Sequence, residues 1–145
     1  ELESKLTAIS ARRDTAHTEI KRIESRSAEL TLVMKHAGTY RQLKPLYDRY
    51  RKSNDKEKFL RGHESEIILF EAAARELKRL GAVPLPTTES MKTELANLSA
   101  EKERLLAEYK TARTEVQEYE TVKQNVDALL AVPKEQEQQR RHELE

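Results

Sequence analysis

The chain has 145 residues, and its 27 basic and 26 acidic side chains leave a net charge of +1, which argues against a general polyanion binder. With only 3 Gly and 4 Pro it has too few turn-forming residues for β-sandwiches, barrels or doubly wound α/β folds. The absence of Cys excludes a disulfide scaffold, a thiolate metal site and a cysteine nucleophile. A hydrophobic share of 37% predicts a thin helical seam rather than a thick core. We therefore expect an all-α, elongated and soluble chain.

Residues 1–37 are predicted to form the first long helix, because apolar side chains recur at alternating spacings of four and three. This period of about 3.5 residues places them on one stripe, which is the requirement for a coiled-coil seam. Arg13 and Ser27 interrupt the stripe. The helix–helix contacts predicted on it are Leu6, Ile9, Ile20, Ile23, Leu30 and Met34.

Gly38 and Thr39 are predicted to end the first helix, and a short head follows. Its first helix covers residues 40–52, where Pro45 either kinks the helix or marks its first turn. The second covers residues 55–80.

The limits of the second head helix are set by local signals. Asn54 is expected to cap its first turn, and Gly81 is expected to end it. Pro84 and Pro86 then prevent the helix from continuing.

Residues 87–131 are predicted to form the second long helix, capped by Thr87 or Thr88. Lys102 and Lys123 interrupt its seam, either to specify register or with side chains that extend past a poorly packed layer. The helix–helix contacts predicted on this seam are Leu98, Leu105, Tyr109, Val116, Tyr119, Val126 and Leu130.

Each long helix has a one-sided seam and therefore needs a partner. The simplest arrangement is an antiparallel helical hairpin of coiled-coil arms, with the two-helix head at one end. A parallel dimer through either seam is the alternative. Residues 1–131 would then form a single helical domain. Residues 132–145 are predicted to be a disordered polar tail, because apolar content is lost from Pro133 onward. The last two residues have the character of a tag remnant.

No catalytic signature is assembled in the sequence. The three glycines are too far apart for a phosphate-binding loop. His63 and Glu64 begin like a zinc-protease helix, but Ile67 stands where a second His is required. Asp14 and His17 form one carboxylate–histidine pair, whereas a dinuclear bundle site needs two. We predict no catalytic residue, no metal ligand, no cofactor and no small-molecule substrate.

Residues 40–62 are the most informative stretch, because they hold eight basic and three acidic residues, a local net charge of +5. Aromatic residues interleave these cations, a pattern typical of single-stranded nucleic acid binding. The alternative is that the tyrosines pack on one helical face while the cations solvate the opposite face. The candidate DNA contacts are Arg41, Lys44, Tyr47, Arg49, Tyr50, Arg51, Lys52, Lys56, Lys58 and Arg61.

Several short motifs carry a resemblance to a known family by their order and spacing. They are residues 44–48 (KPLYD), 56–59 (KEKF), 66–73 (EIILFEAA), 80–81 (LG), 85–86 (LP), 107–109 (AEY) and 122–130 (VKQNVDALL). Over residues 37–131 the chain resembles the C-terminal helical region of relaxases, the mobilisation nucleases carried by conjugative elements of Gram-positive gut bacteria.

The resemblance implies a parent endonuclease that nicks one DNA strand at a transfer origin, forms a tyrosyl-DNA bond and pilots the strand through a secretion channel. Its N-terminal nuclease domain holds a divalent metal with a histidine cluster. The four His of this chain, at positions 17, 36, 63 and 142, include no His-x-His pair, so no catalytic residue is carried over. The chain begins at Glu1 without Met and is expected to be a non-enzymatic fragment of that parent.

The partners expected from the resemblance are single-stranded or transfer-origin DNA, transfer proteins, or a second copy of the chain. The expected setting is the bacterial cytoplasm, without membrane insertion. The alternative function is a structural coiled-coil module for protein interaction, with no nucleic-acid role.

Overall fold

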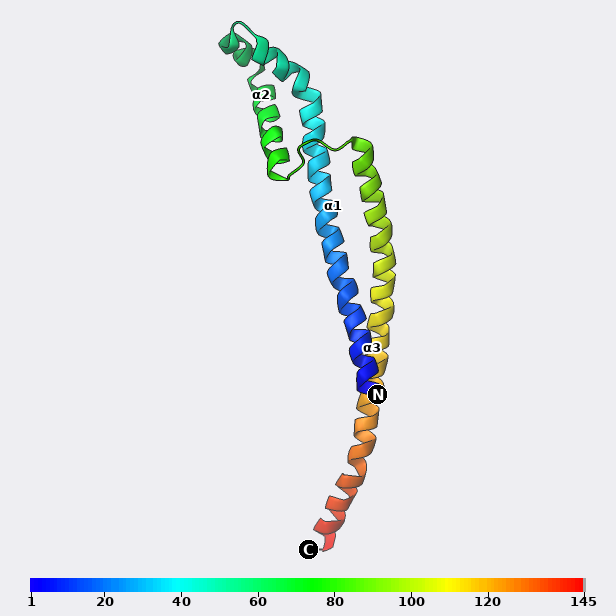
Figure 1. Cartoon of the computed structure of the whole chain (residues 1–145). Coiled ribbons are helices and arrows are strands. Elements are labelled where there is room, and N and C mark those ends of the chain that lie inside the picture. Colours follow the sequence, from blue (N-terminus) through cyan, green and yellow to red (C-terminus); the bar gives the residue numbers. More distant parts are fainter. Residues whose placement is uncertain (145) are drawn as a thin grey trace. The chain divides into compact units, whose positions relative to one another are not determined.

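A computed structural model describes the backbone of residues 1–144 and the side chains of residues 1–131. It contains three helices, α1 (Leu2–Lys52), α2 (Lys56–Arg79) and α3 (Thr88–Leu144), and no strand in the described residues (Figure 1). The prediction of an all-α fold is confirmed.

The chain divides into two compact units. The terminal unit comprises Glu1–Lys21 and Glu101–Glu145, and the central unit comprises Arg22–Ala100. Helices α1 and α3 contribute residues to both units, whereas α2 belongs to the central unit alone. The single domain expected over residues 1–131 stays a prediction.

In the terminal unit, the start of α1 packs against α3 along the expected seam. Its buried cluster consists of Ile9, Ala112 and Val116, with Leu6 and Tyr119 packed against it. Early residues of α1 meet late residues of α3, so the two segments run in opposite directions within this unit. The contacts that establish this direction are Glu3–Lys123 at 3.5 Å, Arg12–Glu115 at 3.2 Å and the His17–Tyr109 ring pair at 5.8 Å.

Within the central unit, α1 continues without a break through Gly38 and Thr39, so the predicted helix ends at 37 and 40 are wrong. A helical glycine costs only about 1 kcal/mol relative to alanine, and here the preceding residue, Ala37, is fully buried. Pro45 lies inside the helix and cannot donate a hydrogen bond to the carbonyl of Arg41. In Figure 1 the last turns of α1 bend away from the axis of the preceding turns.

Helix α2 begins one residue later than the sequence suggests. Asp55, not Asn54, is the N-cap, because its carboxylate accepts a hydrogen bond from the Lys58 backbone N–H at 3.1 Å. Aspartate and asparagine cap helices about equally well, so the type of residue does not distinguish the two positions. The helix is kinked at His63, whose φ and ψ are −137° and 28°.

The predicted end of α2 is confirmed. Gly81 adopts a φ of 69°, and its N–H donates to the carbonyl of Lys78 at 3.1 Å, while the N–H of Ala82 donates to that of Leu77 at 2.9 Å. These two bonds form a Schellman motif, which needs a left-handed residue at the position of Gly81. Thr87 then caps α3, because its hydroxyl oxygen accepts from the Ser90 N–H at 3.1 Å.

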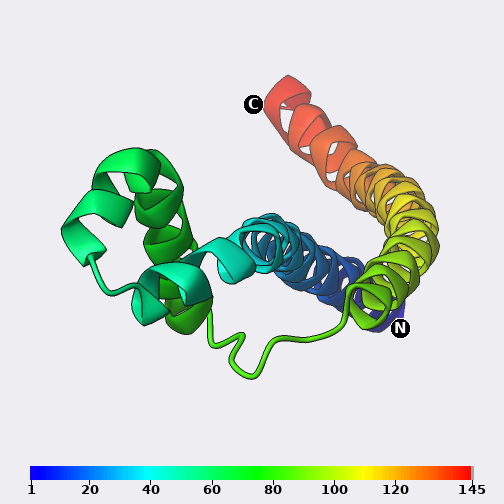
Figure 2. The same ribbon diagram turned by 90° about the horizontal axis from the view of Figure 1, so that it is seen from above.

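Helix α2 lies beside the last turns of α1, and an extended segment over residues 80–87 leads from it to the start of α3 (Figures 1 and 2). The side chains that α2 buries are Ile67, Phe70, Ala73 and Leu77. The buried residues of this unit on α1 and α3 include Ile23, Leu30, Val33, Ala37, Met91 and Leu98.

Most residues of the predicted seams are buried or half-buried, but the last two on α3 are exposed. Ile9, Ile20, Ile23, Leu30, Leu98, Leu105 and Val116 are buried, and Leu6, Met34, Tyr109 and Tyr119 are half-buried. Val126 and Leu130, however, are 42% and 69% exposed, so the prediction that they contact a helix is corrected. They lie beyond Lys123, which already pairs with Glu3 at the start of α1.

Helix α3 also continues through most of the predicted disordered tail. Its backbone is helical to Leu144, and Glu, Gln and Arg, which make up most of this stretch, have high helix propensity. The side chains of residues 132–144, and residue 145 altogether, lie outside the described part of the chain. In the described residues, none of the helices has a stretch long and apolar enough to span a bilayer.

Candidate nucleic-acid interface

The aromatic residues of the basic stretch are packed against one another. Phe70 of α2 stacks with Tyr40 and Tyr47 of α1, at ring-centroid distances of 4.8 and 4.3 Å. The series continues from Tyr47 to Tyr50, Phe59 and His63, with centroid distances of 5.7, 6.0 and 4.7 Å. The geometry therefore favours packing as the main role of these rings, which is the alternative raised by the shared helical face of the tyrosines.

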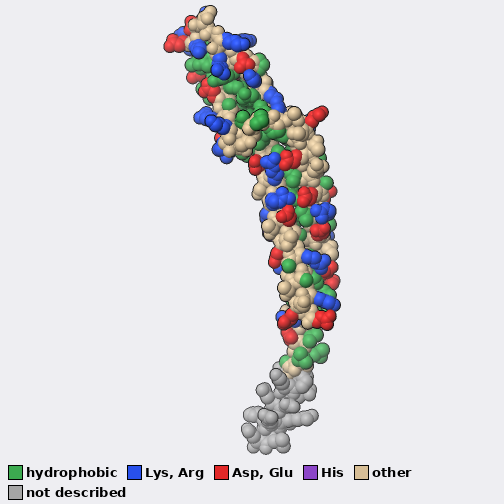
Figure 3. All heavy atoms as spheres, viewed as in Figure 1, with side chains coloured by type: hydrophobic (Ala, Val, Ile, Leu, Met, Phe, Trp, Pro, Cys, Tyr) green, Lys and Arg blue, Asp and Glu red, His purple; other side chains and the backbone are tan. Residues whose placement is uncertain are grey.

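A groove of about 600 Å³ lies between the last turns of α1 and the second half of α2. Tyr40, Tyr47 and Phe70 contribute its aromatic lining. Four cationic and two acidic side chains also line it, so its net charge is +2. The cations are Lys44 and Arg51 from α1 and Arg75 and Lys78 from α2, and the carboxylates are Asp48 and Glu71. Apolar and cationic side chains lie together over this unit in Figure 3.

Arg75 and Lys78 were not among the sequence-predicted contacts. Lys78 follows Phe70 and Ala74 at intervals of four, and Arg75 follows Glu71 at the same interval, so a search along one side of α2 could have found both. The groove brings them together with only three predicted residues, Lys44, Tyr47 and Arg51.

The other predicted contacts are placed outside the groove. Arg41 donates hydrogen bonds to the carbonyl of Pro86 at 2.6 Å and to the hydroxyl of Thr88 at 3.0 Å, so it fastens the 80–87 segment to α1. The guanidinium of Arg49 lies 5.7 Å from the ring centroid of Phe59.

The remaining cations of the stretch are exposed around the α1–α2 connection. They are Lys52, Lys56, Lys58 and Arg61. Arg61 donates to the carbonyl of Glu57 at 3.4 Å. Within the described residues, the side chains of Lys52, Lys56 and Lys58 make no ion pair, so no carboxylate neutralises them directly.

Inside the groove the cations differ in how far they are already neutralised. Lys44 pairs with Asp48 at 3.1 Å, an exposed pair one helical turn apart. Arg51, Arg75 and Lys78 are exposed and, among the described residues, make no ion pair. These three cations line the same groove without an ion-pair partner, and a phosphate oxygen could bind beside them.

On α2, outside the groove lining, Glu76 and Arg79 form a close ion pair at 2.6 Å. The hydrogen bond from Arg79 lowers the pKa of Glu76 below its ordinary value, and the same bond raises the pKa of Arg79. Both groups therefore stay charged at neutral pH and neutralise each other. They do not add to the charge of the groove.

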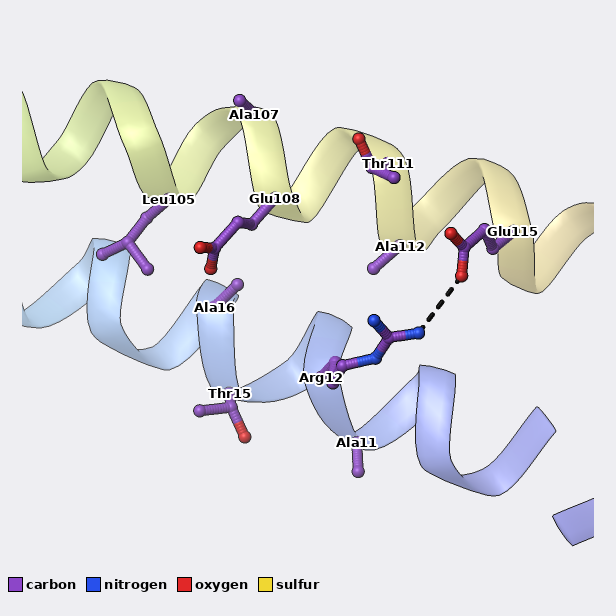
Figure 4. Close-up of a pocket in the computed structure, with 10 residues that line it drawn as sticks. All are labelled: Ala11, Arg12, Thr15, Ala16, Leu105, Ala107, Glu108, Thr111, Ala112 and Glu115. Atoms are coloured by element: carbon purple, nitrogen blue, oxygen red, sulfur yellow. Dashed lines mark hydrogen bonds and ion pairs between the residues drawn. The ribbon is translucent and has the colours of Figure 1, made fainter. Parts of the chain in front are cut away.

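The terminal unit contains a different groove, of about 670 Å³, between the start of α1 and α3 (Figure 4). Its lining includes the small side chains Ala11, Thr15, Ala16, Ala107, Thr111 and Ala112. Arg12 reaches across to Glu115, and the carboxylate of Glu108 points toward α1 near Ala16 (Figure 4). The small side chains of this lining allow the two helices to approach closely. Its residues do not place a nucleophile beside a general base, as a catalytic site would require.

Asp14 and His17 line a smaller hollow, of about 320 Å³, where the His17 ring lies against Tyr109. In the part of the chain with described side chains, no three His, Asp or Glu residues are grouped as metal ligands would be.

Comparison with known proteins identifies no relative: no family model, no curated protein and no solved structure matches this chain. The likeness to relaxases therefore rests on the sequence motifs alone.

Proposed function

We propose that this chain is a non-catalytic accessory domain of a DNA relaxase, and that its central unit binds single-stranded DNA in the cationic groove between α1 and α2. The main support for the DNA contact is that four cations from two helices line one groove: Lys44, Arg51, Arg75 and Lys78. The relaxase assignment is supported by the ordered motifs over residues 37–131. In this proposal the protein works in the bacterial cytoplasm, and the nuclease with its divalent metal belongs to another part of the parent enzyme.

The contact would be made mainly with phosphates. Tyr40 and Tyr47 already stack on Phe70, so they are less available as platforms for successive bases. Phosphate contacts position a strand without reading its sequence. Binding would therefore tolerate many sequences and weaken as salt rises, because each neutralised phosphate releases counterions.

The proposed role of the long helices is to form the arms of an antiparallel coiled-coil hairpin. Its support is local: in the central unit Arg26 of α1 binds Glu94 of α3 at 2.8 Å, and in the terminal unit Arg12 binds Glu115 at 3.2 Å. Such arms would present surfaces to transfer proteins or to a second copy of the chain.

The test of the DNA contact compares two variants with the same charge change. The groove variant replaces the four groove cations with Gln: Lys44→Gln, Arg51→Gln, Arg75→Gln and Lys78→Gln. The matched control replaces four exposed lysines outside the groove: Lys5→Gln, Lys21→Gln, Lys92→Gln and Lys110→Gln.

Fluorescence anisotropy with a labelled single strand and with a duplex of the same length measures affinity. We expect the groove variant to lose at least about tenfold in single-strand affinity and the control to lose less than about threefold. Equal losses in the two variants would mean that only net charge matters, and the groove would then have no specific role.

The competing function, a structural interaction module without a nucleic-acid role, is favoured by one observation. Val122, Val126, Leu129 and Leu130 of α3 expose 48%, 42%, 71% and 69% of their surface, the kind of apolar face that protein partners cover. Absence of single-strand binding by the unmodified chain, together with concentration-dependent light scattering, would support this function instead.

A further inference from the structure

A second pocket, of about 590 Å³, adjoins the cationic groove. It lies at the C-terminal end of α2, beneath the 80–87 segment. Its own lining consists of Leu77, Gly81, Val83, Pro84 and Leu85, and it shares Tyr40, Ala74 and Lys78 with the groove. The two hollows are therefore neighbours that meet around Tyr40 and Lys78.

The pocket is held open by interactions on both sides of its loop wall. On one side, the Schellman motif fixes Gly81 and places Ala82, which is only 9% exposed, against the core. On the other side, Arg41 holds the carbonyl of Pro86. Val83 between them is 66% exposed, so part of the apolar wall faces solvent.

The chemistry of this lining is one-sided. Aliphatic side chains and the Tyr40 ring form most of the wall, Lys78 is its one cation, and no carboxylate is among its described lining residues. A ligand that fits has a flat or apolar body that enters the pocket and an anionic group that stays beside Lys78. A nucleotide unit has both parts, and pockets of this size commonly hold small molecules.

We propose that this pocket receives one unstacked base of the single strand whose phosphates bind in the groove. This inference rests on the proposed function, because it needs the strand to lie in the groove. An uncharged apolar side chain from a protein partner would use the same walls but would gain nothing from Lys78 and the neighbouring Arg75. The cations thus favour a nucleotide over an apolar peptide.

The pocket deepens the proposed function by adding a base-dependent term to phosphate binding. Few lining groups can form hydrogen bonds, so the pocket would accept different bases. It would mainly distinguish a nucleotide that carries a base from one that lacks it. Stacking one base on a protein surface contributes roughly five- to hundredfold in affinity.

The experiment uses the full chain and two probes, an oligothymidylate of about 12 nucleotides and the same backbone with every base removed. The variant is Val83→Gln, which places an amide on the exposed wall and is compatible with folding because Val83 is largely exposed. Val122→Gln is the matched control, since Val122 is also exposed but lies outside the central unit.

We expect the unmodified chain to bind oligothymidylate at least about fivefold more tightly than the abasic backbone. Val83→Gln removes most of this difference and leaves the salt dependence unchanged, whereas Val122→Gln retains the difference. Equal affinity for the two probes, with normal salt dependence, overturns the base pocket and leaves the groove intact. A Val83→Gln variant that keeps the full difference also overturns it. Binding of neither probe overturns the proposed function together with this inference.

Discussion

Gly81 is the residue whose backbone most clearly requires its amino-acid type. Its φ of 69° is a conformation that costs a residue with a Cβ about 1–2 kcal/mol. A Cβ built there would meet no heavy atom within 4 Å, so the cost would come from backbone conformation rather than from a clash. Gly38 also has open space around its Cβ position, but it lies inside α1.

These two glycines predict opposite effects of the same substitution. We expect Gly81→Ala to lower the free energy of unfolding by about 1 kcal/mol and Gly38→Ala to raise it by about 0.5–1 kcal/mol. Urea denaturation monitored by circular dichroism gives both values. Destabilisation of the chain by Gly38→Ala would show that a residue with a side chain is not tolerated in the middle of α1.

The Glu76–Arg79 pair predicts a local effect of pH. Because the folded-state pKa of Glu76 is lowered, its stabilising contribution is present above the ordinary glutamate pKa and is lost as pH falls through the folded-state value. A carboxyl titration by NMR should give a midpoint for Glu76 below that of an unpaired glutamate. Arg79→Gln should return it to the ordinary range. An unchanged midpoint in that variant would assign the lowered pKa to another cause.

At the scale of elements, the contacts between α1 and α3 differ in strength along the two helices. In the central unit the guanidinium of Arg26 binds both carboxylate oxygens of Glu94, at 2.8 and 3.2 Å, and it also binds Glu29 at 3.1 Å. The hydrogen bond with Glu94 is the largest cause of its raised pKa. In the terminal unit Arg12 binds Glu115 through a single hydrogen bond, with 67% of its side chain exposed.

This difference predicts unequal coupling energies. Double-mutant cycles with alanine should give about 0.5–1 kcal/mol for Arg26–Glu94, because the pair is bidentate and partly buried. For Arg12–Glu115 we expect about 0–0.3 kcal/mol. The free energy of unfolding from urea titrations supplies each corner of the cycle. A larger coupling for Arg12–Glu115 would contradict the view that bidentate geometry decides the strength of these contacts.

Local signals predicted the end of α2 and the start of α3. Gly81 and Thr87 lie where a helix must end or begin, and both act through hydrogen bonds to residues at most five positions away. The break predicted at Gly38 failed because a cost of about 1 kcal/mol is outweighed by tertiary packing around Ala37.

Which element each helix faces in the folded chain is not encoded in the sequence of that helix alone. The 3.5-residue period identifies which side of a long helix is apolar, but it does not show where the partner helix ends. The exposure of Val126 and Leu130 therefore could not be predicted from the period. The groove shows the same limitation. Lys44 and Arg51 belong to the basic stretch of the sequence. Arg75 and Lys78 lie near them because the Phe70 ring of α2 stacks on Tyr47 of α1.

The salt dependence of single-strand binding tests whether cations from α1 and α2 form one phosphate-binding groove. The logarithm of the affinity for a single strand falls with the logarithm of salt concentration by about 0.7 per neutralised phosphate. We predict a linear fall for the unmodified chain with a slope between about −2 and −4. Arg75→Gln combined with Lys78→Gln should reduce the magnitude of the slope by about one or more. A slope unchanged by these two substitutions would contradict the claim, because α2 would then contribute nothing to phosphate binding.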